Sequence, residues 1–365
     1  MITEDIIRLL NIFAPYKLDE NDYSGLQIGS LKKRIKKVLL ALDITQDVLN
    51  EAIENSTDII ITHHPLFYES INNINNDTVK GKLISSIVKN NISVYTAHSN
   101  LDISPGGIND KLTKLLDIKN SEIIKEMLVK KLYKIVVFVP YKHAEELREV
   151  ISKKGAGWIG NYSHCSFNVE GIGTFMPREN TNPYIGKKDK LEKVWEVRIE
   201  TIVTEDILED VLSIMIKKHP YEEVAYDIYP LINKTKVYGI GRIGNIQPTK
   251  LKDFAQKVKK NLDCGNVKVY GKIDKTIERV AVCGGSGSDL INIVNDKGAD
   301  AYITGDIRPE DAKKALDLGL NLIDANYYNT EKIILPVIKQ FLESETSNLE
   351  ISVSEFDNIA PFSII

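Results

Sequence analysis

The sequence has few cysteines and no long apolar run. Its three cysteines, Cys165, Cys264 and Cys283, are an odd number without CxxC spacing, which predicts neither a disulfide framework nor a thiolate zinc site. No apolar run reaches the roughly 18–20 residues needed to cross a bilayer. The first residues carry two acids among the first five and no small-residue cleavage site, so they predict an amphipathic helix rather than a signal peptide. We therefore expect a soluble, cytoplasmic protein with no membrane partner.

The charge balance disfavours a nucleic-acid partner. The net charge of −4 is mildly acidic, and the lysine pairs are short and scattered along the chain, which is typical of solvated surfaces rather than of a phosphate-binding patch. The length of 365 residues predicts two or three domains.

Apolar β-branched runs alternate with helical stretches at both ends of the chain. Strands are expected at 36–44, 58–64 and 92–98, and again at 278–286, 299–306 and 320–326. We expect a helix after the first strand, with Thr45 as its N-cap. The first two strands of each set are 242 residues apart (280 − 38 and 304 − 62), and the third strands 228 (325 − 97). This spacing predicts two duplicated α/β lobes; the alternative is that any two βαβ units look alike.

The middle of the chain has a different pattern. It reads β-α-β-β-α-β, the order of a ferredoxin-like α+β domain, with a polar loop at 178–190 that we expect to be long and mobile. The predicted organisation is a first α/β lobe over 1–127, an inserted ferredoxin-like domain over 128–232 and a second α/β lobe over 233–365.

Two adjacent histidines, His63 and His64, follow three isoleucines and precede Pro65. This pattern places them at the carboxyl end of a buried parallel strand, where α/β sheets present ligand sites. Adjacent strand residues point to opposite faces, so the pair could address two ions where the strand enters a loop. The alternative is that both histidines simply cap a core strand.

Further possible ligands follow the corresponding strands. His98 and Asp102 come just after the third strand, and Asp324 and Glu331 follow its counterpart. Imidazole and carboxylate together form the ligand set of Zn²⁺, Mn²⁺ or Fe²⁺ in hydrolytic sites, and a carboxylate can bridge two ions. The other histidines, His143, His164 and His219, are expected to be ordinary residues of the insert.

A glycine-rich segment at 283–291 (CGGSGSDLI) has two interpretations. It could cradle an anion at a helix N-terminus, although it lacks the spacing of a dinucleotide fingerprint or a P-loop. It could equally be a tight strand-to-helix turn capped by Ser288 or Asp289.

Several blocks together resemble a known family. They are SGLQIG, ALDIT, ITHHPLF, AHSNLD, GGSGS, YITGDI and a terminal DAxxYxxE. In this order they are similar to the Nif-three-like dinuclear metal-centre family, whose members carry the name GTP cyclohydrolase 1 type 2 homologue. The chain resembles the longer subset, which has a PII- or CutA-like domain inserted between the lobes.

The resemblance implies a metal site and an assembly. By position it implies metal ligation by His63, His64, Asp102 and Glu331, with Glu331 bridging, and places His98 close by, where it could move protons. It further implies two divalent ions per subunit (Zn, Mn, Fe or Mg), a homo-hexamer and a small-molecule substrate or ligand.

Two positions depart from the family pattern. Asn326-Tyr327 stand where the family has Gly-His, and Pro309-Glu310 where it has an aromatic residue and histidine. A tyrosine binds metal only as phenolate, and its ordinary pKa near 10 makes this costly. One ion could therefore be lost, unless Glu310 or Asp306 replaces the missing ligand as an oxygen donor, which would favour Mg²⁺ or Mn²⁺.

Two functions fit these residues. The first is a metal-dependent hydrolase acting on a nucleotide or phosphorylated small molecule. The alternative is a non-catalytic, ring-forming metal- or ligand-binding regulatory protein, and the missing imidazoles increase its weight.

Overall fold

The computed structural model describes residues 1–15, 22–233 and 237–356. The chain divides into two compact units. The first unit combines residues 1–128 with residues 238 onward, and the second spans residues 129–237. For comparison, the sequence pattern predicted an inserted domain over residues 128–232.

The first unit contains a five-stranded sheet, the first sheet, in the order β1-β4-β3-β2-β15. Its strands β2, β3, β4 and β15 are parallel, and β1 is antiparallel at the edge. The strands are β1 (Gly25–Ile28), β2 (Lys37–Ala41), β3 (Ile59–Thr62), β4 (Ser93–Thr96) and β15 (Glu350–Val353). The accompanying helices are α1 (Thr3–Phe13), α2 (Gln46–Glu54), α3 (Val79–Lys89), α4 (Ser99–Ile103) and α5 (Ile108–Leu116).

The second sheet of this unit has six strands in the order β11-β14-β13-β12-β10-β5. The strands are β5 (Lys119–Val129), β10 (Val237–Lys250), β11 (Lys268–Tyr270), β12 (Thr276–Val282), β13 (Ala301–Thr304) and β14 (Asn321–Asp324). The helices are α8 (Leu251–Asn261), η2 (Ser288–Leu290), α9 (Ile291–Asp296), α10 (Pro309–Asp317), α11 (Tyr327–Glu331), η3 (Lys332–Ile334) and α12 (Leu335–Glu345).

The two sheets repeat one arrangement. Val38 pairs with Ile59 in the first sheet, and Val280 pairs with Ala301 in the second. Each residue of the second pair is 242 positions later in the chain than its counterpart in the first (280 − 38 and 301 − 59). The third strands follow with the shift of 228, because Ser93 and Asn321 hold the same position against their neighbours (321 − 93). The pairing register therefore agrees with the spacing read from the sequence.

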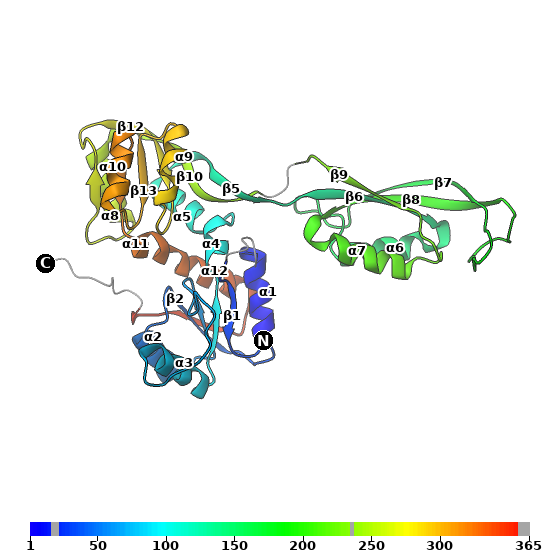
Figure 1. Cartoon of the computed structure of the whole chain (residues 1–365), viewed down its shortest axis with the longest axis horizontal. Helices are drawn as coiled ribbons and strands as arrows, with labels where there is room; N and C mark the ends of the chain where they lie inside the picture. Colours follow the sequence, from blue (N-terminus) through cyan, green and yellow to red (C-terminus); the bar gives the residue numbers. More distant parts are fainter. Residues whose placement is uncertain (16–21, 234–236, 357–365) are drawn as a thin grey trace. The chain divides into compact units, whose positions relative to one another are not determined.

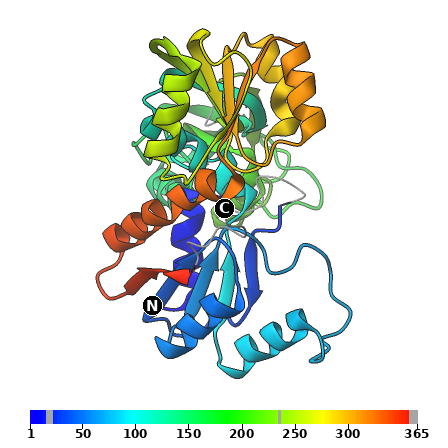
Figure 2. The same cartoon turned by 90° about the vertical axis from the view of Figure 1, so that its left-hand side faces the viewer.

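The sheets also exchange strands, which the sequence pattern did not indicate. β5 comes from the first segment of the chain and joins the second sheet, whereas β15 comes from the last segment and joins the first sheet. Each of the two chain segments that form the unit thereby contributes one strand to the sheet built mainly from the other segment. The helices α11 and α12 run between the two sheets (Figures 1 and 2).

Local sequence explains the strand and helix that carry the first histidines. β3 consists of Ile59, Ile60 and Ile61 followed by Thr62, all buried, as expected for a parallel strand covered on both faces. The expected N-cap of α2 is confirmed, because the Thr45 hydroxyl accepts a hydrogen bond from the Val48 N–H at 3.2 Å.

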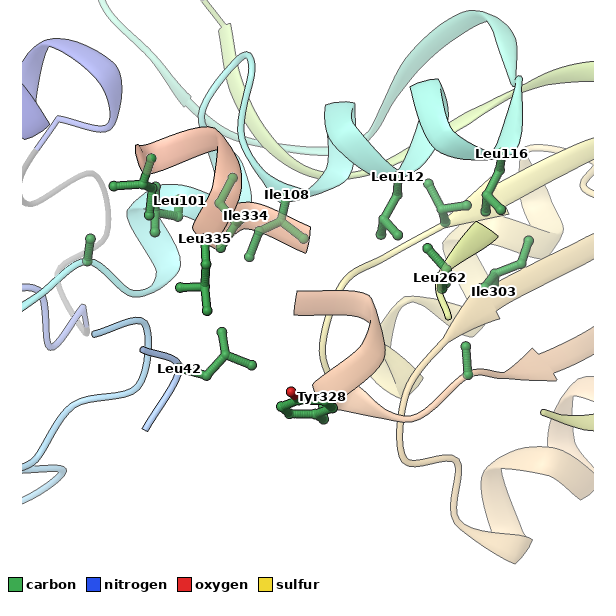
Figure 3. Packing of buried hydrophobic residues seen from close by; sticks show 14 of the residues in the cluster. Leu42, Leu101, Ile108, Leu112, Leu116, Leu262, Ile303, Tyr328, Ile334 and Leu335 are labelled. Carbon is green, nitrogen blue, oxygen red and sulfur yellow. The ribbon is translucent and has the colours of Figure 1, made fainter. Parts of the chain in front are cut away.

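One hydrophobic core joins the two sheets of the first unit. It includes Leu40 and Ile59 from the first sheet and Val280 and Ile303 from the second. Figure 3 shows part of this core, with Leu42 after β2, Ile303 on β13 and Leu262 just after α8; the helices contribute Leu101, Ile108, Leu112, Leu116, Tyr328, Ile334 and Leu335. A shared core fixes the strand ends of one sheet relative to those of the other.

The second unit has the element order expected from the sequence. It consists of β6 (Leu132–Pro140), η1 (Tyr141–His143), α6 (Ala144–Lys153), β7 (Ser166–Phe175), β8 (Glu192–Thr204), α7 (Glu205–Lys218) and β9 (Tyr226–Leu231). The strands form an antiparallel sheet in the order β7-β8-β6-β9. Both helices lie on one face of it (Figure 1) and cover a core that includes Val137, Ile199 and Met215.

No helix within the described ranges combines the length and apolar character that a membrane span requires.

Truncating the shared core should destabilise the first unit. Leu112 on α5 is fully buried, so we expect Leu112→Ala to lower its unfolding free energy by about 2–5 kcal/mol. Leu316 on α10 is 45% exposed and provides the matched control, with an expected loss under about 1 kcal/mol for Leu316→Ala. Thermal unfolding followed by circular dichroism measures both; equal melting temperatures for the two variants would contradict the shared core.

Candidate metal centre

His63 and His64 lie directly beyond β3. Their backbone N–H groups donate to Ala41 at 3.2 Å and to Leu42 at 2.8 Å, so the ladder with the β2 strand extends past the strand end. The two rings stack with centroids 5.0 Å apart. The side chains are therefore on a rigid support rather than in a free loop.

Each imidazole is oriented by a hydrogen bond at its Nδ1 atom. His63 Nδ1 lies 3.1 Å from the Ala97 carbonyl oxygen and must donate to it. His64 Nδ1 lies 3.0 Å from Asp43 Oδ1. In both rings this arrangement leaves Nε2 as the nitrogen that points into the site, an orientation common among metal-binding histidines.

Asp43 was not singled out from the sequence. It follows β2 just as the histidines follow β3. The rule that side chains gather at the carboxyl ends of parallel strands would have found it.

Two carboxylates meet these nitrogens from other elements. Glu331 ends α11, and its Oε2 lies 3.0 Å from His64 Nε2 while its Oε1 lies 3.8 Å from His63 Nε2. Asp102 on α4 places Oδ1 3.6 Å from His63 Nε2. The structure thus brings together all four residues that the resemblance implied as ligands.

Two of these atoms are buried without a hydrogen bond. Among the described residues, His63 Nε2 and Asp102 Oδ1 are enclosed polar atoms with no hydrogen-bond partner, and Glu331 Oε2 contacts the His64 imidazole at 3.0 Å. An unpaired buried polar atom is costly. The ligand atoms of His63, His64 and Glu331 lie within 4.8 Å of one another, close enough to share one metal ion.

The pKa values show how strongly the charges interact. Burial lowers the pKa of His63, and the neighbouring His64 and His98 lower it further. Burial also disfavours the charged form of His64, but Asp43 and Glu331 outweigh it and raise the His64 pKa to about 10. Burial raises the pKa of Asp102, and Glu331 adds to that rise. Negative charge is thus concentrated where the imidazole nitrogens converge, and a cation there would relieve it.

Backbone geometry positions Glu331. Asn326 begins α11 with φ of +66° and caps it by accepting from the Tyr328 N–H at 2.9 Å. This left-handed conformation favours glycine and tolerates asparagine, which explains how Asn326 replaces the glycine of the family pattern.

The glycine-rich segment supports the site rather than leaving its amides free. The N–H groups of Gly284, Gly285 and Gly287 donate to side-chain oxygens of Asn109, Thr330 and Thr304. Gly285 has φ of +68°, and a Cβ there would collide with Glu331 Oε1. These contacts favour the tight-turn interpretation over the anion cradle, but η2 has no side-chain cap from Ser288 or Asp289.

His98 and Tyr327 lie beside the four residues. The His98 ring is 5.5 Å from that of His63 and 6.2 Å from that of His64. Its Nδ1 lies 3.2 Å from Ser99 Oγ and 3.7 Å from Asp22 Oδ1. Tyr327 places its ring 5.7 Å from that of His64, so the tyrosine does occupy the edge of the site.

The alternative oxygen ligands have other contacts. The Asp306 carboxylate accepts from the Tyr327 N–H and the Asn326 amide, and Glu310 is exposed and pairs with Arg308 at 3.5 Å. Asp324, also considered from the sequence, accepts backbone N–H groups of Asp306, Ile307 and Asn326. It organises the loop rather than facing the histidines.

An aromatic wall adjoins the site. Tyr23 and Tyr68 contact each other at 5.7 Å between ring centroids, and each lies 6.3 Å from the His98 ring. Together with residues 67–71 they line an open surface depression of about 550 Å³.

The chain is similar to known proteins over nearly its whole length. Residues 1–359 match the family model described as Duf34/NIF3 (NGG1p interacting factor 3). A Halalkalibacterium halodurans protein named "GTP cyclohydrolase 1 type 2 homolog" is 44% identical over 342 residues, covering 93% of this chain and 92% of that protein. The Bacillus subtilis protein of the same name is 42% identical over 356 residues, covering 97% and 95%.

Solved structures are also similar to this chain over its whole length. A Bacillus cereus protein described as related to NIF3 superposes with a TM-score of 0.86 and is 40% identical, covering 100% of this chain and 99% of that one. A Staphylococcus aureus protein superposes with a TM-score of 0.79 at 29% identity and the same coverage.

Adding a side chain at Gly285 should disturb the centre. Gly285→Ala would push against Glu331, so we expect the affinity for added Zn²⁺ or Mn²⁺ to fall about 10–100-fold. Gly319 also has a positive φ, but nothing lies within 4 Å of its would-be Cβ, so Gly319→Ala controls for backbone strain alone. Metal titration by calorimetry compares the two, and equal affinities would contradict the support assigned to Gly285.

Proposed function

The chain belongs to the DUF34/NIF3 family, and on that basis we propose that it is a metal-dependent hydrolase acting on a nucleotide or phosphorylated small molecule. The observation that carries this proposal is the buried cluster of ligand atoms of His63, His64 and Glu331, with Asp102 beside it, next to the aromatic wall. Relatives carry the name GTP cyclohydrolase 1 type 2 homolog.

The residues present fit a divalent cation. His63 offers a neutral nitrogen, and His64 offers one once a bound cation displaces its proton. Asp102 and Glu331 offer oxygens, which completes the mixed set that Zn²⁺, Mn²⁺ and Fe²⁺ accept. Glu331 directs its two oxygens at different histidines, so it suits a bridging role between two ions. A bound cation supplies Lewis acidity for polarising a substrate oxygen and activating water.

The other residues of the site have roles that follow from their positions. Asp43 holds the His64 ring in place through Nδ1. His98 can hold or move a proton at Nε2, because its Nδ1 faces Ser99 and Asp22. Tyr23 and Tyr68 line the neighbouring depression with aromatic rings and suit a ring-containing substrate.

We further propose the assembly and domain origins that the resemblance implies. The first unit is a duplicated α/β lobe, and residues 128–232 form a ferredoxin-like, PII- or CutA-like insert; the antiparallel order β7-β8-β6-β9 supports this. The subunits form a homo-hexamer in the cytoplasm, a state that light scattering after gel filtration would measure directly.

The alternative function is a non-catalytic, ring-forming metal- or ligand-binding regulator. The observation that favours it is Tyr327, which places a phenol next to His64 where the family pattern has a histidine. The site then holds one ion well and the second ion weakly.

Turnover separates the two functions. Protein loaded with Mn²⁺ or Zn²⁺ should hydrolyse GTP or a member of a phosphoester panel, and His64→Ala should abolish this turnover because Glu331 loses its nearest ligand partner. His164→Ala changes an exposed histidine of the insert and should leave the rate unchanged. Tight nucleotide binding without turnover in wild type would favour the regulator and contradict the hydrolase.

Restoring an imidazole at position 327 should strengthen metal binding. Tyr327→His places a nitrogen ligand beside His64, so we expect more metal bound per chain than in wild type. Tyr162→His adds a histidine at an exposed position of the insert and should leave the amount unchanged. Elemental analysis of the dialysed proteins measures both; an unchanged metal content in Tyr327→His would contradict a ligand position at residue 327.

A further inference from the structure

The second unit contains a cavity of about 490 Å³ that the metal site does not use. Its wall is formed by the end of β7, by Glu196 on β8, by residues 221–225 after α7 and by the loop between β7 and β8. The volume is in the range of small-molecule sites.

The loop over the cavity is held in place by specific bonds. The Asn182 N–H donates to Glu222 Oε2 at 2.8 Å, and the Asp189 N–H donates to the Pro177 carbonyl at 2.8 Å. Arg178 pairs with Asp189 at 3.3 Å. This is the polar segment 178–190 for which the sequence predicted a long loop; it bears Pro183 and Tyr184 on the cavity wall.

Aromatic rings form one side of the cavity. Tyr221 contacts Phe175 at 5.7 Å and Tyr184 at 6.3 Å between ring centroids. Tyr184 is held by His143, whose Nε2 lies 2.9 Å from its hydroxyl. His219 positions Tyr221 by accepting its backbone N–H at Nδ1 over 3.1 Å, so two of the insert's histidines support these rings.

A buried carboxylate faces the rings. Glu196 is only 8% exposed, and its Oε1 accepts the Tyr221 hydroxyl at 2.6 Å. Its Oε2 passes over Gly173, where any Cβ would collide with it. The Tyr221 hydroxyl occupies only Oε1. Glu196 also lines the cavity, so a cation in the cavity can approach its carboxylate.

Acidic groups outnumber basic ones in the lining of the cavity. Glu222 and Glu223 join Glu196, against Arg178 as the single cationic group, and Arg178 is already paired with Asp189. Aromatic faces with a carboxylate behind them are the surroundings that attract organic cations through cation–π and Coulomb interactions.

We propose that this cavity binds an organic cation, a protonated amine or quaternary ammonium group with a small apolar body. The cation lies against the rings of Phe175, Tyr184 and Tyr221 and faces Glu196. The site is independent of the metal centre and of the activity proposed there.

Choline and its neutral isostere 3,3-dimethylbutan-1-ol test the proposal on the full chain, because they differ in charge and hardly in shape. Titration followed by ligand NMR should give saturable choline binding and an isostere at least about tenfold weaker. Glu196→Gln and Tyr184→Ala should each weaken choline about tenfold. Tyr184 is 54% exposed, so its variant remains informative if the buried substitution impairs folding.

Matched controls locate the effect. Glu170→Gln alters an exposed carboxylate of β7 that contacts Trp195, and Tyr162→Ala removes an exposed ring outside the cavity; both should bind choline as wild type does. His64→Ala should also bind it normally, which separates this site from the metal centre. Equal binding of choline and its isostere, no saturable binding of choline, or wild-type affinity in both cavity variants would overturn the proposal.

Discussion

Glu331, on the helix that follows β14 of the second sheet, reaches His64, which follows β3 of the first sheet, with 3.0 Å between carboxylate oxygen and imidazole nitrogen. Burying a carboxylate is expensive unless opposite charge or hydrogen bonds compensate. Here the compensation comes from a residue more than two hundred positions earlier in the chain. The contact forms only if the strand ends of both sheets lie at the same place. The shared core and the exchanged strands hold the two sheets together, and the glycine turn leaves room for the Glu331 carboxylate.

The surroundings of this contact explain its chemistry. When both are ionised, Asp102 and Glu331 carry more negative charge than the neutral His63 and the protonated His64 carry positive charge. Burial raises the pKa values of both carboxylates. The ligand atoms of His63, His64 and Glu331 lie close enough to one another to hold a metal ion. Tyr327, which stands where the family pattern has a histidine, lies at the edge of the site and changes none of the four ligand residues. The chain could therefore bind one metal ion without binding two.

Much of this arrangement could be predicted from the sequence. Isoleucine runs followed by His63-His64 indicated a buried strand end, and the equal spacing of two strand pairs matched their later register. Asp43 could have been found by the same rule. The strand exchange of β5 and β15 could not, because edge strands pair through backbone groups that carry no sequence signal. The cavity of the insert was also missed, since a polar loop pattern does not reveal that Tyr184 and Glu196 converge.

The most direct test of the metal centre is the metal content of the purified wild-type chain, together with its melting temperature after chelation and after addition of Zn²⁺ or Mn²⁺. We expect divalent metal to copurify with the chain, chelation to lower the melting temperature, and added ion to restore it by binding the folded state. A protein with no bound metal whose melting temperature responds to neither ion would contradict it.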